Sequence, residues 1–236
     1  MSKTELMYIC EHGKVTPEMI MMHEHEFTEQ DENGMTALMY LCRNKNVTPE
    51  LIMMLQPEFK MIDNMHMTAL MHLCSWGHFE VDDNGSIEYK SIHSKNLIPS
   101  IDLINALHEE IGMCNIYGCT ALMYLCGNIR ITPKHILQLH DEIYMVDMNG
   151  FTALHHLADV NSSISESLID ILKDNIGKRS NDGHTALNYL LVNNLKGIKT
   201  SVIRALRKER HMLQGDGELA ISRYTGTDTN IIELLK

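Results

Sequence analysis

The chain has 236 residues, of which 44% are hydrophobic and 22% are charged, and this composition excludes a wholly disordered protein. The formal net charge of −11 argues against general binding to a phosphate backbone, which needs clustered Lys and Arg. Residues 1–14 lack the apolar core of a secretory leader, and no apolar run approaches the roughly 20 residues of a membrane span. We therefore expect a soluble, intracellular protein of the cytoplasm that makes no membrane contact.

A seven-residue motif recurs along the chain and begins with a threonine in six copies. In its three strongest copies it reads Thr-Ala-Leu-Met, then Tyr or His, then Leu-Cys. The steps between the threonines are 32, 32, 52, 32 and 33 residues, and one more step of 32 reaches a degenerate copy at Gly217. A fixed period of this size predicts a stack of similar units. The six threonines are Thr4, Thr36, Thr68, Thr120, Thr152 and Thr185.

A second motif keeps step with the first and predicts another helix in each unit. Thr16-Pro17, Thr48-Pro49 and Thr132-Pro133 each precede an apolar stretch. Threonine at an N-cap accepts a backbone N–H, and proline at the first helical position lacks a donor that would have no partner there. Each unit therefore reads as a short helix, a turn, a capped second helix and a loop.

The loop before each threonine, which we call a finger, carries turn-forming residues. Glycine stands two positions before the threonine in most copies, with His66 as the exception, and Asp or Asn stands five positions before it. Glycine tolerates positive φ, and Asx side chains bond to the backbone two residues on, so each finger is predicted to be a tight turn. The glycines are Gly34, Gly118, Gly150, Gly183 and Gly215, and the Asx residues are Asp31, Asp63, Asn115 and Asp147.

This pattern resembles the ankyrin-repeat family, whose 33-residue unit carries Thr-Pro-Leu-His-x-Ala after a β-turn. Here alanine replaces the proline and methionine replaces the histidine in the strongest copies, while His155 keeps the histidine. The Thr-Ala-Leu-Met variant is similar to ankyrin arrays of protists and large DNA viruses, and a protein of this type from a pathogen or virus would act inside a host cell. The resemblance implies an all-α solenoid, a single array over residues 1–236 with about seven repeats. They start near residues 4, 36, 68, 120, 152, 185 and 217.

The step of 52 is a step of 32 with about 20 extra residues, at about 79–97 in the third repeat. Two alternating stretches, 79–82 and 86–89, flank Asp83-Asn84-Gly85, which is a hairpin signal. An isolated two-stranded hairpin is marginal in water. The insertion therefore packs on the array, becomes ordered on binding, or is disordered.

Cysteine and histidine raise the question of a disulfide or a metal site. Four of the six cysteines stand six positions after the threonine, and stacked helices about 8–10 Å apart cannot bring such a column within disulfide distance. His72 and His156 take the place of tyrosine in other copies, which favours a shared repeat role. We predict buried, reduced cysteines, no metal site and no cofactor. The column is Cys10, Cys42, Cys74 and Cys126.

Methionine is abundant, with 18 residues, and most of it is expected to fill the core. One core column is Met7, Met39, Met71 and Met123. The methionines of the second helices, Met21, Met22, Met53 and Met54, are expected in the core as well.

In the ankyrin family, partner contacts usually come from the fingers and from the end of the first helix. At those positions this chain has apolar side chains where water alone would favour polar ones, and exposed apolar patches mark interaction sites. We predict a binding site on the concave face of repeats three to five, unless the fingers bury these side chains against one another. The predicted residues are Met35, Met65, Met67, Trp76, Ile116, Tyr117, Cys119, Met148, Phe151, Val160 and His184.

The predicted function is protein binding, as an adaptor or a stoichiometric inhibitor. An enzyme is disfavoured because the sequence has no Gly-rich phosphate loop, no Cys-x-x-Cys and no nucleophile elbow. The alternative is a nucleic-acid or ribonucleoprotein contact through residues 196–211, which contain six basic residues and one acidic residue, Glu209. Residues 1–33 carry eight carboxylates against Lys3 and Lys14. The two charged ends are either solvated faces or the contacts of a weak head-to-tail self-association.

Overall fold

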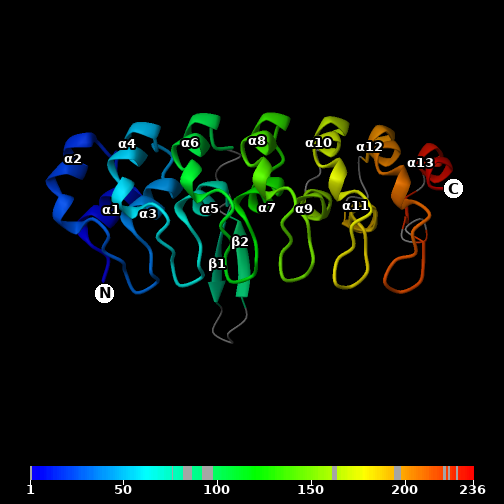
Figure 1. Cartoon of the computed structure of the whole chain (residues 1–236), viewed down its shortest axis with the longest axis horizontal. Coiled ribbons are helices and arrows are strands. Elements are labelled where there is room, and N and C mark those ends of the chain that lie inside the picture. Colours follow the sequence, from blue (N-terminus) through cyan, green and yellow to red (C-terminus); the bar gives the residue numbers. More distant parts are fainter. Residues whose placement is uncertain are drawn as a thin grey trace. The chain divides into compact units, whose positions relative to one another are not determined.

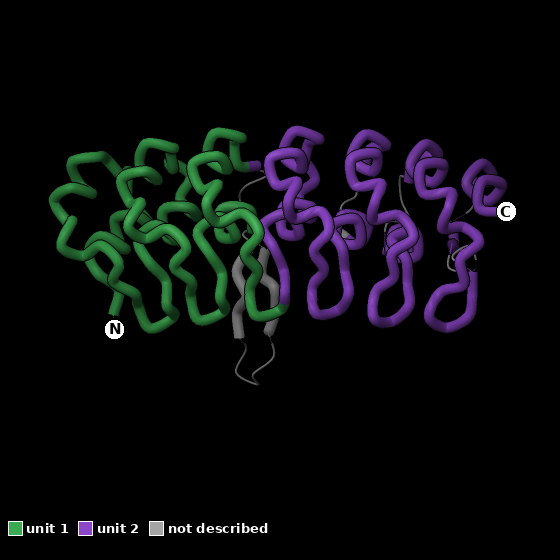
Figure 2. Tube along the Cα trace, in the orientation of Figure 1, with its two compact units in different colours: residues 1–93, 99–117 green, residues 94–98, 118–236 purple. Residues whose placement is uncertain are grey.

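A computed structural model describes residues 2–75, 77–81, 87–91, 98–160, 164–193, 198–219, 222, 224–226 and 228–236, with the backbone alone for 77–81, 87–91 and Val160. The chain divides into two compact units (Figure 2). Unit 1 is residues 1–93 with 99–117, and unit 2 is residues 94–98 with 118–236. Within the described residues, no helix combines the length and the apolar character needed to cross a membrane.

The described part of unit 1 contains three helix pairs arranged in two rows, and a short 3-10 helix follows each pair (Figure 1). The inner row, in which neighbours pack side by side, is α1 (Glu5–His12), α3 (Ala37–Arg43) and α5 (Ala69–Cys74). The outer row is α2 (Pro17–Met22), α4 (Pro49–Met54) and α6 (Ile101–Ala106). The 3-10 helices are η1 (Glu24–Glu26), η2 (Gln56–Glu58) and η3 (His108–Glu110).

Unit 2 repeats this arrangement. Its inner helices are α7 (Ala121–Cys126), α9 (Ala153–Val160) and α11 (Ala186–Asn193). Its outer helices are α8 (Pro133–Gln138), α10 (Glu166–Ile171), α12 (Thr200–Ala205) and α13 (Thr229–Leu235). The 3-10 helices are η4 (His140–Glu142), η5 (Lys173–Asn175) and η6 (Arg207–Glu209). Residues 220, 221 and 223 lie outside the described residues, so the count of about seven repeats stays a prediction.

The stretches predicted to form a hairpin pair with each other in unit 1. Strands β1 (Gly77–Val81) and β2 (Ile87–Ser91) are antiparallel, with Val81 opposite Ile87 and Gly77 opposite Ser91. The predicted turn, Asp83-Asn84-Gly85, lies outside the described residues. The limits of the insertion, 79–97, therefore remain a prediction.

Thr16 and Thr48 cap the outer helices α2 and α4, as predicted, with proline at the first position of each helix. Threonines of the seven-residue motif, for which we predicted no cap, do the same for the inner helices. The Oγ1 atoms of Thr36, Thr68 and Thr120 each accept a hydrogen bond from the backbone N–H three residues on, at 3.4 Å. In these five helices a threonine side chain therefore satisfies an end N–H.

The cysteine column is buried, as predicted, and none of the six cysteines, which all lie in the described part of the chain, forms a disulfide. Burial raises the pKa of the Cys10 thiol to about 12 and holds the pKa of Cys42 well above its ordinary value. A thiol with a raised pKa carries little thiolate, the reactive form, at neutral pH. The cysteines of the column fill the contact between neighbouring inner helices.

The inner-helix methionines Met7, Met39, Met71 and Met123 are buried, as predicted. The prediction for the outer helices was wrong, because Met22 is 75% exposed and Met21 and Met53 are exposed as well. The outer row buries one stripe, represented by Ile20 and Ile52; Met21, Met22 and Met53 lie outside this stripe, and Met54 is half-buried. A single buried stripe is typical of a helix that packs on one side only.

Buried glutamates, which the sequence reasoning missed, accept an N–H group at the start of the inner helices α3, α5, α7 and α11. Glu58 Oε2 accepts the N–H of Leu38 at 2.7 Å, and the Thr36 hydroxyl also bonds to this carboxylate. Glu110 and Glu142 bind the N–H groups of Leu70 and Leu122 at the same distance. Burial raises the pKa of Glu58, Glu110 and Glu209, while the N–H donors oppose the rise. The glutamates stand 22 residues after the threonine in uninterrupted copies such as Glu26, Glu58 and Glu142, a spacing that could have revealed them.

The same carboxylates hold a turn of the preceding repeat in an unusual conformation. Thr28 and Lys60 have φ of 67° and 64°, and their N–H groups donate to Glu58 and Glu110 at 3.3 and 3.0 Å. Positive φ is costly for residues with a side chain, above all a β-branched one. Charge-assisted hydrogen bonds to a buried carboxylate offset that cost.

In the repeat that keeps the family histidine, other side chains bond to the start of the inner helix and to the preceding turn. His155 Nδ1 accepts the N–H of Thr152 at 3.2 Å and lies 2.9 Å from the Thr152 hydroxyl. Asn175 replaces the glutamate, and its Nδ2 donates to the carbonyl of Ile143 at 3.1 Å. Asn175 donates a hydrogen bond where the glutamates accept one. The preceding turn therefore presents the carbonyl of Ile143 and not an N–H group, and Ile143 has a helical φ and ψ.

Candidate partner-binding surface on the fingers

Three fingers are closed by their aspartate, as the sequence predicts. Asp31 Oδ1 accepts the N–H groups of Asn33 and Met35, both at 2.9 Å, and Asp31 N–H donates to the carbonyl of Met35. Asp63 and Asp147 make the same three bonds in their own fingers. These three fingers therefore share one set of backbone bonds and differ mainly in the side chains that they present.

Glycines two positions before the threonine have positive φ, for example 76° at Gly34. His66 takes the same conformation with φ of 58°, so the exception in the sequence is also a turn. The last finger is shifted relative to our expectation. Gly217 has φ of 82°, and the bond from Gln214 N–H to Glu218 O matches the bond between Asp31 and Met35. Gly217, and not Gly215, is therefore the turn glycine of that finger.

Neighbouring fingers are joined through the residue four positions before the threonine. The N–H groups of Asn64 and Ile116 donate to the carbonyls of Asn33 and Met65 in unit 1, at 2.9 and 3.1 Å. In unit 2 the N–H of Asn181 donates to Asn149 in the same way. Asparagine adds a side-chain bond to this joint, from Asn64 Nδ2 to Glu32 O at 2.9 Å and from Asn181 Nδ2 to Met148 O at 2.7 Å. Isoleucine at position 116 keeps the backbone bond without such an addition, so the joint does not require an apolar side chain.

In three inner helices, α3, α5 and α9, the tyrosine or histidine binds the aspartate of its own finger. Tyr40 Oη donates to Asp31 Oδ2 at 2.6 Å, and His72 Nε2 lies 2.9 Å from Asp63 Oδ2. His156 Nε2 lies 3.1 Å from Asp147 Oδ2. Histidine and tyrosine therefore share one structural role, as predicted for His72 and His156.

In unit 1 the predicted site residues fall into buried and exposed sets. Met35 and Met67 are each only 5% exposed, so they pack inside the fingers and offer little surface to a partner. Met65 and Tyr117 are half-buried, and Ile116 is 44% exposed. Trp76 lies outside the described residues. Of the predicted set in this unit, Ile116 is the most exposed described side chain.

In unit 2 the predicted residue that is most exposed is Met148, at 60%. Cys119, Phe151 and His184 are half-buried, and the side chain of Val160 lies outside the described part of the chain. The ring of Phe151 lies 4.8 Å from that of Tyr189 and 5.4 Å from that of His155. Phe151 is thus partly covered by neighbouring rings, whereas Met148 is the exposed apolar side chain of the same finger.

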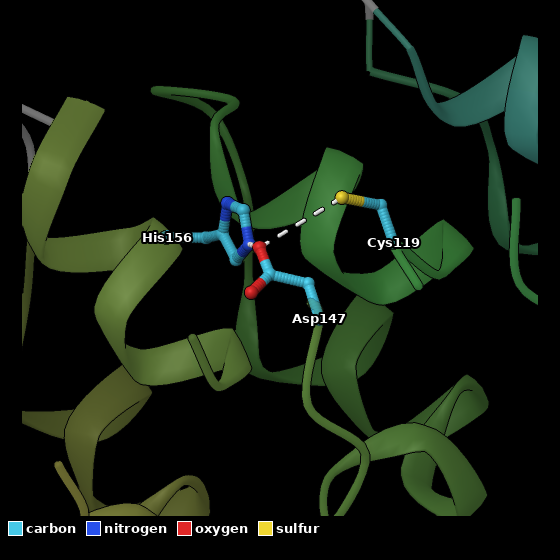
Figure 3. A group of neighbouring side chains, drawn as sticks. All are labelled: Cys119, Asp147 and His156. Carbon is cyan, nitrogen blue, oxygen red and sulfur yellow. Dashed lines mark hydrogen bonds and ion pairs between the residues drawn. The ribbon is translucent and has the colours of Figure 1, made fainter. Parts of the chain in front are cut away.

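The structure also brings together three side chains that the sequence does not connect (Figure 3). Cys119 Sγ lies 3.9 Å from Asp147 Oδ2, the same oxygen that His156 Nε2 approaches. Burial alone would raise the pKa of Asp147, but hydrogen bonds from His156 and from the N–H of Phe151 lower it. Because the carboxylate bonds to both the thiol and the imidazole, the order differs from a nucleophilic triad, in which the imidazole stands between the other two groups.

The comparisons with known proteins agree with this architecture. Residues 6–81 match the family model "Ankyrin repeats (3 copies)". No curated protein matches the sequence significantly. The ankyrin-repeat domain of Bcl-3, a member of the IkappaB family, is similar over 99% of this chain and 98% of that chain, with a TM-score of 0.65 and 16% identity.

A second similar structure is a chain in the complex of the predatory endopeptidase Bd0816 from Bdellovibrio bacteriovorus with the immunity protein Bd3460. The similarity covers 89% of this chain and 100% of that chain, with a TM-score of 0.58 and 18% identity. At such identities the likeness concerns the fold. Residues 6–81 therefore carry ankyrin repeats by sequence, and the chain has the fold of an ankyrin-repeat domain over its described length.

Proposed function

We propose that this chain is a protein-interaction module that binds its partner through exposed apolar side chains on the fingers. The fold supports this proposal because an array whose repeats contact only their neighbours offers an extended surface and few deep clefts. One of the similar structures is itself a protein–protein complex. The partner can be the client of an adaptor or the target of a stoichiometric inhibitor, and we expect no catalysis.

The observation that carries the proposal is the side chain four positions before the threonine. Three repeats place a polar residue there, namely Glu32, Asn64 and Asn181, and all three are exposed. Two repeats place Ile116 and Met148 at this position instead, and both are exposed too. Asparagine adds a side-chain bond to the finger joint that an apolar side chain cannot make, so the fold gains nothing from isoleucine or methionine here. Two exposed apolar side chains that the fold does not need are best explained by a partner.

Each unit supplies one of these two side chains, so their contributions can be tested separately. Ile116→Asn and Met148→Asn copy the residue that Asn64 and Asn181 already provide, and we expect both variants to fold like the wild type. Met22→Asn is the matched control, since it removes an even more exposed methionine from α2. Tagged wild type and variants would be used as baits in extracts of the native cells, with captured proteins identified by mass spectrometry.

We expect a set of proteins that wild type and Met22→Asn retain and that Met148→Asn or Ile116→Asn loses. A central interface residue contributes about 2 kcal/mol or more, which is roughly a thirtyfold loss of affinity once the partner is purified. If the double variant Ile116→Asn, Met148→Asn is folded and still captures the same proteins at equal strength, the fingers are not the binding surface.

A second candidate function rests on the basic segment around α12 and η6. Lys199, Arg204, Arg207 and Lys208 are exposed, while Glu209 is fully buried against the N–H groups of α11 and therefore does not offset them at the surface. This segment would suit an RNA or another polyanion. Binding to a homopolymeric RNA should then weaken steeply as salt rises, and binding that ignores ionic strength would exclude this function.

A further inference from the structure

We propose that Cys119, Asp147 and His156 form a binding site for one divalent transition-metal ion, with Zn²⁺ as the favoured ion. Their donor atoms all lie within 4.8 Å of one another, although 28 residues separate Cys119 from Asp147. This departs from our expectation of no metal site, because that expectation weighed the cysteine column and the histidines but not Cys119 together with Asp147 and His156. One sulfur, one oxygen and one nitrogen form a donor set that Zn²⁺ accepts.

The spacing of the donors is close to what a tetrahedral ion requires. Zn²⁺ bonds of about 2.0–2.3 Å imply donor separations of about 3.3–3.6 Å. The separations from Asp147 Oδ2 are 3.1 Å to His156 Nε2 and 3.9 Å to Cys119 Sγ, and no two of the three donors are more than 4.8 Å apart. Side-chain rotations that move the donors by up to about 1 Å would bring all three around one ion. The fourth position is left for water or for a donor from a bound partner.

The central ligand is already held in place by the finger. Asp147 is buried, and its Oδ1 accepts two backbone N–H bonds, which directs Oδ2 toward the other two residues (Figure 3). Support of this kind around a ligand raises metal affinity. Cys119 and His156 are half-buried, so an ion can reach them from solvent.

The repeat pattern explains two of the three residues but not the third. Asp63 and His72 form the same pair in unit 1, so the aspartate and the histidine belong to the finger. The position of Cys119, one before the threonine of the preceding repeat, is occupied there by Met35. Because other repeats place Met67, Phe151 or His184 at this position, the fold does not require a thiol. Among the described residues, only here does a cysteine thiol lie beside such an Asp–His pair.

Two substitutions remove a ligand while keeping a residue that the fold already uses. Cys119→Met copies Met35. His156→Tyr copies Tyr40, whose hydroxyl makes the equivalent bond to Asp31. Cys114→Ser is the control, because Cys114 is an exposed cysteine outside the group. Ion binding releases the thiol proton, and the imidazole must bind through a deprotonated Nε2, so affinity should fall as pH is lowered.

The test is a titration of the reduced, chelator-stripped full chain with Co²⁺ and then with Zn²⁺. We expect one equivalent of Co²⁺ to give a thiolate-to-cobalt charge-transfer band that Zn²⁺ abolishes. Cys119→Met should lose the band, His156→Tyr should lower Zn²⁺ affinity at least about tenfold with unchanged circular dichroism, and Cys114→Ser should behave like wild type. The second candidate group, Glu5, His23 and Glu26, has no thiol and cannot give this band. A missing band, a band that survives in Cys119→Met, or unchanged Zn²⁺ affinity in His156→Tyr would overturn the proposal.

Discussion

Replacement of His155 by methionine would convert α9 to the sequence type of α3 and α5, and would leave a buried threonine without its acceptor. Thr152 is 2% exposed, so water cannot replace the imidazole. A buried donor left without a partner costs about 1–3 kcal/mol. Loss of the stacked contact between His155 and Phe151, at 5.4 Å, adds about 0.5–1.5 kcal/mol. We therefore expect His155→Met to lower the free energy of unfolding by about 2–4 kcal/mol.

The measurement is urea unfolding at pH 7.5, followed by far-ultraviolet circular dichroism, with the midpoint and the slope fitted separately. Asn175→Glu supplies the carboxylate that accompanies methionine in α3 and α5. In the double variant His155→Met, Asn175→Glu, this introduced carboxylate could accept the Leu154 N–H and the Thr152 hydroxyl, as Glu58 does for Leu38 and Thr36. It would also require the Ile143 turn to change to the conformation seen at Thr28, so we expect a partial recovery.

The double variant should be more stable than the sum of the two single effects by at least about 1 kcal/mol, because the two residues share one set of backbone partners. Strictly additive effects would refute the idea that histidine with asparagine and methionine with glutamate are alternative solutions. A cost below about 0.5 kcal/mol for His155→Met would refute the role given to the imidazole.

Three further predictions concern stability. Burial lowers the pKa of His155 to about 4 from an ordinary value of 6.5, so the unfolded chain binds a proton at this residue before the folded chain does. The free energy of unfolding should therefore fall by up to about 3 kcal/mol between pH 6.5 and 4. Urea midpoints across this range should show the loss in wild type but not in His155→Met, and an equal pH dependence of the two proteins would contradict the prediction. Glu58→Ala should cost about 2–4 kcal/mol, because the buried N–H of Leu38 loses its acceptor and the Thr28 turn loses its support, and an unchanged melting temperature would mean that water reaches this place. Gly34→Ala should cost more than Gly112→Ala, since both have positive φ but only at Gly34 would the new Cβ meet a neighbour, 2.8 Å from Asn64 N; equal losses of about 1–2 kcal/mol would show that backbone strain alone is felt.

The sequence by itself determined the repeat, its caps and its core. The step of 32 residues aligns the threonine, leucine, methionine and cysteine columns. Each column has one environment in every repeat, because stacked repeats present the same face to the same neighbour. The roles of the capping threonines, the cysteines, His72 and His156 followed from that alignment. Even the buried glutamates have a regular spacing, and they were missed because charged residues are expected at the surface.

Only the tertiary structure decided which side chains on this framework are open to solvent. Met35 and Met148 both lie on fingers, yet Met35, one position before the threonine, is buried, and Met148, four positions before it, is exposed like every described residue at that position. Packing also places Met22 at the surface, since one apolar stripe suffices to pack an outer helix. The meeting of Cys119 with Asp147 and His156 also comes from two successive fingers, and no local spacing encodes a distance between side chains that are 28 residues apart.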